Sequence, residues 1–251
     1  MDARLGGRMK PVTDQLRRAF APTGKLRAAL NHGNRVLVSR DEAGNPKGIT
    51  VDLACALAER LELPLEFVEK DRAVDVSSVA SDDVFDICFL AVDPERARTI
   101  DFSDPYIRIE GSYLVASHCA TADARTLVSE GHKVGTVEGS AYTLNLSRKP
   151  GAENLVSYPD IDTALEAMDG GAVVAIAGIK NVMEAEAAVR EGARVVEPPF
   201  MEICQAMGVP AGRPEAAGYL AEFVAEMARS GRVGEILERH GISVDCAVIP
   251  A

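Results

Sequence analysis

Residues 86–106, D-I-C-F-L-A-V-D-P-E-R-A-R-T-I-D-F-S-D-P-Y, constrain the fold more than any other part of the chain. The apolar run at 87–92 is typical of a short buried strand. Asp93-Pro94-Glu95 then predicts a helix start, because Asp is a good N-cap, Pro suits the first helical position and an acid is favoured in the first turn. The stretch therefore predicts a strand that runs straight into a helix.

Arg96 follows about one turn into this predicted helix, beside the free N–H groups of its first turn. Those N–H groups, the positive end of the helix and the guanidinium fork together form a corner that suits a carboxylate. The alternative is a solvated arginine paired with Glu95 or Asp101, since surface ion pairs are common and weak.

The segment P-E-R-A-R-T-I-D-F-S-D-P-Y closely resembles the signature of the type II periplasmic solute-binding proteins of family 3, the polar amino-acid receptors of ABC transporters. Further matches follow in the same order. They are G-I-T-V-D-L at 48–53, V-G-T-V-E-G-S at 134–140, M-G-V-P-A-G-R at 207–213, and G-R-V-G-E-I-L-E-R-H-G at 231–241. In this family the arginine that corresponds to Arg96 clamps the ligand's α-carboxylate.

The resemblance implies an α/β fold of the periplasmic-binding-protein type II class, with two α/β lobes joined by two crossing strands. We expect an N-terminal extension at 1–23, lobe 1 at 24–110 plus 206–251, and lobe 2 at 111–205. The crossings would lie at 106–116 and 200–209, with Gly111 suited to a hinge. Periodicity predicts helices at 9–23, 52–61, 161–168, 214–227 and 231–240, and further strands at 25–30, 36–39, 65–68, 134–137 and 173–176.

Several loops at the ends of predicted strands are expected to reach the ligand. Where the family has an acid and an aromatic residue after the first strand, this chain has Asn31 and Asn34, so amide hydrogen bonding would replace a stacking lid; a plain polar turn is the alternative. Backbone contact is expected at Leu90 and Ala91, because the family's hydroxyl side chains are missing there. Gly139 and Ser140 precede the predicted second-lobe helix and would offer a second set of N–H groups, so that one ligand carboxylate bridges them and Arg96; Ala141 beside them is a further ligand-contact candidate.

The family's amino-acid receptors usually carry an aspartate for the α-ammonium group where this chain has Ala177 and Gly178. Nearby Lys180 adds a positive charge instead, so we expect a small organic acid without an ammonium group, either with or without a second acidic group. Glu202 and Gln205 on the second crossing are further cleft candidates. Two other charged residues can each be interpreted in two ways. Glu110 faces either the cleft or solvent. Arg72 is either a second anion contact or, as we favour, a solvated side chain.

The net charge of −11 argues against nonspecific nucleic-acid binding and against docking on anionic lipid. The five cysteines show no metal-ligand spacing, so we expect neither a metal nor another cofactor. The first 20 residues lack the apolar segment of a secretory signal, and the longest apolar run, 172–179, is too short to span a bilayer. Family resemblance implies a periplasmic protein; the missing signal makes the cytoplasm the alternative.

We therefore expect a monomeric, non-catalytic binding protein that closes on a small carboxylate ligand and serves ABC-type transport, with a permease as partner, or sensing. One alternative is an enzyme on the same scaffold, as in the related cyclohexadienyl dehydratase, with groups drawn from Glu110, Glu202, His32 and Lys180. The other is a cytoplasmic ligand-sensing module.

Overall fold

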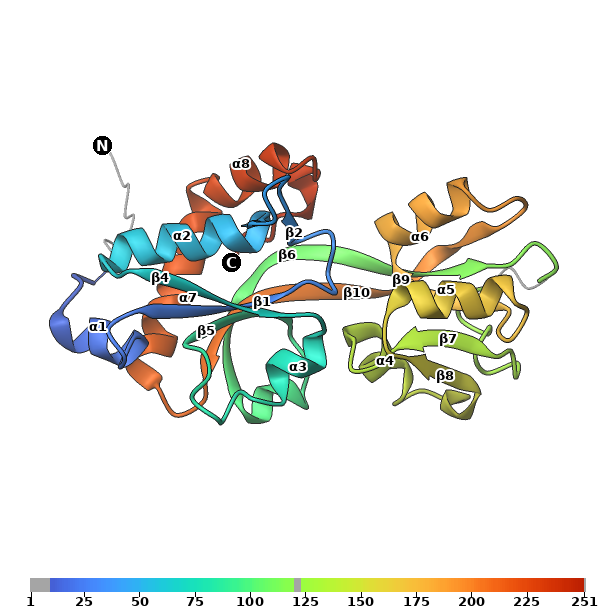
Figure 1. Cartoon of the computed structure of the whole chain (residues 1–251), viewed down its shortest axis with the longest axis horizontal. Coiled ribbons are helices and arrows are strands. Elements are labelled where there is room, and N and C mark those ends of the chain that lie inside the picture. The colour runs from blue at the N-terminus through green and yellow to red at the C-terminus, as the bar shows by residue number, and fades with distance from the viewer. Residues whose placement is uncertain (1–9, 120–122, 251) are drawn as a thin grey trace, which may run out of the picture.

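The computed structural model describes residues 10–119 and 123–250. Figure 1 shows two α/β lobes joined by two long strands, β6 (Ile100–Val115) and β10 (Arg194–Pro210). Eight strands form one hydrogen-bonded sheet in the order β4-β1-β5-β10-β6-β9-β7-β8, which runs through both lobes. The predicted fold class is confirmed.

The first lobe is built on three parallel strands that end at the same edge. They are β1 (Leu26–Asn31), β4 (Leu65–Lys70) and β5 (Ile87–Ala91). Its helices are α1 (Asp14–Phe20), α2 (Ile49–Leu61), α3 (Ala73–Ser77), α7 (Pro214–Arg229) and α8 (Arg232–Arg239). Apolar side chains at helical spacing on α2, namely Leu53, Leu57 and Leu61, are fully buried in its core. A two-strand hairpin, β2 (Ser39–Arg40) and β3 (Pro46–Lys47), precedes α2.

The second lobe repeats this plan on a smaller scale. Its parallel strands are β7 (Val134–Val137) and β8 (Leu155–Tyr158), with β9 (Ala175–Ile179) parallel to β7. Its helices are α4 (Ala141–Leu146), α5 (Ile161–Asp169) and α6 (Lys180–Ala188). Three short 3-10 helices complete the described chain: η1 (Arg96–Arg98), η2 (Ala152–Asn154) and η3 (Val244–Cys246).

The two connecting strands pair antiparallel in both lobes, but their register shifts between Val196 and Met201, opposite Gly111 of β6. A Cβ at Gly111 would lie 2.8 Å from Cγ of Met201, so a larger residue would disturb the packing there. This interruption lies next to the predicted hinge. The residue boundaries proposed for the lobes stay a prediction.

Several predicted elements differ in extent. Residues 36–38 form a turn rather than a strand, because the Asn34 carbonyl accepts the N–H groups of Leu37 and Val38. The helix expected after Asp93 is only the three-residue η1, since β6 begins at Ile100 and leaves no room for further turns. The strand predicted at 173–176 is β9, which continues to Ile179. The helix predicted at 9–23 is α1; residue 9 lies outside the described residues.

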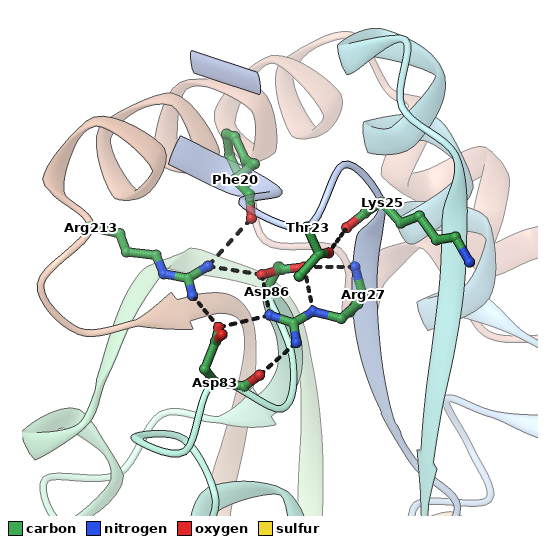
Figure 2. Close-up of polar contacts among 7 residues, drawn as sticks. All are labelled: Phe20, Thr23, Lys25, Arg27, Asp83, Asp86 and Arg213. Carbon is green, nitrogen blue, oxygen red and sulfur yellow. Dashed lines mark hydrogen bonds and ion pairs between the residues drawn. The ribbon is translucent and has the colours of Figure 1, made fainter. Parts of the chain in front are cut away.

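A buried charge network lies at the amino ends of β1 and β5 (Figure 2). The fully buried Asp86 carboxylate accepts the backbone N–H (2.9 Å) and Nε (3.0 Å) of Arg27, and Nη1 of Arg213 (2.9 Å). Asp83 accepts a hydrogen bond from each of the two arginines. Arg213 also donates to the carbonyl oxygen of Phe20 at 3.3 Å. The network thus fastens α1 and the loop before α7 to the first-lobe sheet, at the end opposite the carboxyl ends of its parallel strands.

Candidate functional site

A cavity of about 210 Å³ lies between the lobes, at the carboxyl ends of β1, β5 and β7. Ligands bind at this position in open α/β sheets. The volume is below the roughly 300–1,000 Å³ of pockets for drug-sized ligands, so the cavity suits a small molecule. Residues of both lobes line it, so a molecule bound there would contact both.

Arg96 is the buried charged residue among the described residues that line the cavity, and it is only 4% exposed. Its Nη1 donates to the Ala91 carbonyl oxygen at 2.9 Å, and its Nη2 donates across the cleft to the Gly139 carbonyl oxygen at 2.8 Å. The buried Nε has no partner among the described residues. Burial lowers the pKa of Arg96. Glu95 pairs with Arg98 instead, so the interpretation of Arg96 as a solvated surface arginine is wrong.

Asp93 lies just behind Arg96 and takes part in a second contact between the lobes. Its buried carboxylate accepts the Glu95 N–H at 2.9 Å and forms an ion pair with Arg148 of the second lobe at 2.7 Å. Burial raises the pKa of Asp93, but the hydrogen bonds from Arg148 and the Glu95 N–H, together with the nearby positive charges, outweigh burial. The net effect is a lowered pKa.

Two buried amides accompany Arg96 in the interior. Asn34 and Gln205 are each 6% exposed and line the cavity. Asn31 lines it too; its Oδ1 accepts the Gly33 N–H, while Oδ1 of Asn34 accepts the Val36 N–H. These turns fix the side-chain oxygens and leave the amide NH₂ groups as the available donors. The remaining buried lining is largely apolar and comprises Leu90, Ala91, Tyr142, Ile179 and Ile203.

The second-lobe loop approaches Arg96 through its backbone. Gly139 has φ +65°, a conformation that favours glycine, and its carbonyl points to Arg96. The prediction that the N–H groups of Gly139 and Ser140 face the ligand is wrong, because Gly139 presents its carbonyl oxygen to Arg96 and the Ser140 N–H donates to the Val137 carbonyl oxygen. The Ser140 hydroxyl caps α4 by accepting the Thr143 N–H. Within the described residues, the first-turn N–H groups of α4 left without an acceptor are therefore those of Ala141 and Tyr142, which line the cavity. Burial raises the pKa of Tyr142 to about 12.

Ion pairs close the rim of the cavity. Arg72 pairs with Glu138 of the second lobe at 2.7 Å and with its neighbour Asp75 at 2.7 Å, so it is neither simply solvated nor a free anion contact. Arg35 pairs across the cleft with Asp162 at 2.5 Å. His32 contacts Glu69 at 2.8 Å within the first lobe.

Two predicted charged residues of the site, Lys180 and Glu202, lie away from this cavity, and Gly139 is not part of its lining either. Lys180 forms ion pairs with Glu110 at 3.0 Å and Glu197 at 2.8 Å, because β9 extends to Ile179 and brings that side chain to the cavity instead. Glu202 lies near Arg108 at 3.5 Å and lines a separate cavity of about 360 Å³. Alternation along β10 explains this placement, since Ile203 and Gln205 share one face and Glu202 lies on the other. The same alternation was the signal that could have identified Ile203.

The described residues contain no group of three or more His, Cys, Asp or Glu side chains able to hold a metal ion. Within the same ranges, none of the helices has the length and apolar character needed to cross a membrane. The five cysteines are free thiols.

Known proteins resemble the chain over most of its length. A family model described as bacterial extracellular solute-binding proteins, family 3, matches residues 26–242. No curated protein sequence matches the chain. A mutant of ArgBP from T. maritima has 19% identity and a TM-score of 0.76, over 90% of this chain and 99% of that one.

Two further solved structures resemble the chain at similar levels. The ancestral amino acid-binding protein AncCDT-1, a precursor of cyclohexadienyl dehydratase, has 21% identity and a TM-score of 0.73, over 90% of this chain and 99% of that one. A histidine kinase sensor domain with similarity to periplasmic binding proteins has 19% identity and a TM-score of 0.75, over 86% of this chain and 95% of that one. At these identities the likeness shows the fold.

Proposed function

The chain belongs to family 3 of the bacterial extracellular solute-binding proteins, and from this premise we propose that it binds a small carboxylate-bearing solute between its lobes. The observation that carries the proposal is the buried Arg96, which forms no ion pair with any described carboxylate. A buried charge without a counter-charge is costly, so the site favours an anion that supplies one. Three of the five guanidinium N–H groups take no acceptor among the described residues: one on the buried Nε and one on each terminal nitrogen. The guanidinium therefore keeps hydrogen-bonding capacity for such a ligand.

Closure of the lobes follows from the same contacts. Arg96 belongs to the first lobe and Gly139 to the second, so their hydrogen bond forms only when the lobes approach. A carboxylate held by Arg96 and by the N–H groups of Ala141 and Tyr142 would make its full set of contacts in the closed form alone. Such a ligand stabilises the closed form by its differential affinity for it.

The biological role that we propose is delivery of the solute to an ABC permease or to a sensor, outside the cytoplasm, by a monomer without catalytic activity. Resemblance to ArgBP and AncCDT-1 supports binding as the activity, and resemblance to a histidine kinase sensor domain supports sensing as the second route. His32 is held by Glu69, and Lys180 lies outside the cavity, so two groups considered for catalysis are engaged elsewhere.

A thermal-shift screen of small organic acids and amino acids tests the proposal. A ligand at 100 times its Kd adds about 2.7 kcal/mol of stability, which a melting curve resolves readily. Arg96→Met should abolish the shift, because it removes the charge and keeps most of the buried stem. Arg98→Met is the matched control, since Arg98 lies two residues away in the same η1 and pairs with the exposed Glu95. Equal shifts in wild type and Arg96→Met would refute the assignment.

A further inference from the structure

The charged groups around the cavity indicate which other groups the ligand carries besides its carboxylate. The buried lining contains one charged group, Arg96, among the described residues; its other polar side chains include the amides of Asn34 and Gln205. Asp93 is close enough to act on Arg96, but its carboxylate is taken by Arg148, which brings a positive charge of its own. The interior therefore carries one net positive charge.

The acidic residues that line the cavity lie at its exposed rim. Glu138 is paired with Arg72, and Asp160 caps α5 by accepting the Thr163 N–H at 2.7 Å. Asp71 is exposed at the mouth. Among the described residues, none of the buried lining positions offers a carboxylate to a positive group on the ligand. The apolar side chains of Ile179, Ile203 and Leu90 occupy much of that lining.

Building on the function proposed above, we infer that the solute is a carboxylic acid with a neutral polar group, such as a hydroxyl, oxo or carboxamide, and no ammonium group beside its carboxylate. An α-ammonium group is bonded to the carbon next to the carboxylate, so it would enter the buried interior together with it. There it would meet the positive Arg96 region and apolar walls, and it would lose its hydration without an anionic partner. The amide NH₂ groups of Asn34 and Gln205 are suited instead to neutral oxygen acceptors.

Isothermal titration calorimetry on the wild-type chain tests this ligand preference with pairs of compounds that differ at the carbon next to the carboxylate. The pairs are lactate and L-alanine, succinamate and L-asparagine, and glutaramate and L-glutamine. In every pair that shows binding, we expect the acid without the ammonium group to bind about 10–100-fold more tightly than its amino-acid partner, because an unpaired buried charge is penalised. An amino acid that binds as tightly as its partner, or more tightly, would overturn the inference while leaving carboxylate binding intact. Absence of binding by both members of every pair would overturn the proposed function as well.

A second test reverses the preference by adding the missing charge. Ile179→Asp places a carboxylate at the cavity wall, and Ile179→Asn has nearly the same shape without the charge. In the Asp variant, the ratio of the affinity for an amino acid to the affinity for its partner acid should rise at least about tenfold. In the Asn variant this ratio should stay near the wild-type value. Circular dichroism melting curves show whether both variants are folded. Equal ratios in two folded variants would refute the role of charge.

Discussion

Gly139 should control closure of the cleft through its lack of a side chain. A Cβ at this position would lie 2.5 Å from Cβ of Val74 and 3.1 Å from its Cγ2, and Val74 belongs to α3 of the first lobe. The Val74 Cβ is fixed by the backbone of α3, so no rotamer change relieves the overlap. In Gly139→Ala the lobes must therefore separate locally by about 1 Å to restore an ordinary contact.

The free-energy cost divides into two parts with different consequences. Left-handed backbone costs a non-glycine residue about 1–2 kcal/mol, but this strain is present whether the cleft is open or closed and lowers only the overall stability. The overlap with Val74 exists only in the closed form. Overpacking of this kind costs about 1–3 kcal/mol, which corresponds to a roughly 5–150-fold loss of affinity for a ligand that requires closure.

Gly131→Ala is the matched control. Gly131 also lies in the second lobe and has φ +86°, and a Cβ at this position would meet no atom within 4 Å, so the variant shares the strain without the overlap. Titration of the solute identified in the screen should show weaker binding to Gly139→Ala and wild-type binding to Gly131→Ala. Small-angle scattering with the solute present should report a larger radius of gyration for Gly139→Ala. Wild-type affinity in a folded Gly139→Ala would refute the reasoning.

Three further predictions concern charged groups. Arg148→Met should weaken solute binding about 5–30-fold, because the lost ion pair with Asp93 joins the lobes and is worth about 1–2 kcal/mol, as titration calorimetry can measure. Asp86→Ala should lower the free energy of unfolding in urea by about 3–5 kcal/mol, since it leaves the two arginines of the buried network partly uncompensated. Solute binding should also weaken as the pH falls below 3.8, the ordinary pKa of an aspartate such as Asp93. The pKa of Asp93 is lowered in the closed form, so its ionised carboxylate stabilises the closed form above pH 3.8, and this stabilisation is lost when the carboxylate is protonated.

Each of these predictions has a control or an outcome that would contradict it. Arg125→Met removes a similar ion pair, to Asp123, that lies within the second lobe, and it should leave the affinity unchanged. If it weakens binding as much as Arg148→Met, the contact across the cleft has no special role. An Asp93→Asn variant with the same pH dependence as wild type would assign the acid effect to another group. Asp86→Ala with wild-type stability would contradict the account of the buried network.

The sequence predicted the elements that depend on local pattern. The strand β5 could be predicted because it is a short apolar run that is buried along its whole length, and α2 and α7 could be predicted because their buried residues recur with the helical period. Arg96 of the predicted carboxylate corner lines the cavity between the lobes, and its role there stays a prediction. The helix around Arg96 was overestimated, because N-capping residues indicate where a helix can begin and not how soon the next strand follows.

The parts that the sequence could not supply depend on contacts between distant segments. Lys180 was expected in the cleft because β9 was taken to end at Ile176; three further strand residues brought Ile179 there and turned Lys180 towards Glu110 and Glu197. The pairing of Arg148 with Asp93 joins residues 55 positions apart. No local periodicity encodes such a pair, since it depends on how the two lobes meet.

The charge network of Figure 2 also has a practical consequence for experiments. By bonding Arg213 to the carbonyl of Phe20, it anchors α1 at the end of the first lobe that is farthest from the second lobe in Figure 1. Attaching the protein to a sensor surface, or fusing a fluorescent protein to it, on the N-terminal side of α1 would thus leave the mouth of the cavity accessible. Immobilisation through this end should give a biosensor surface on which the solute exchanges freely.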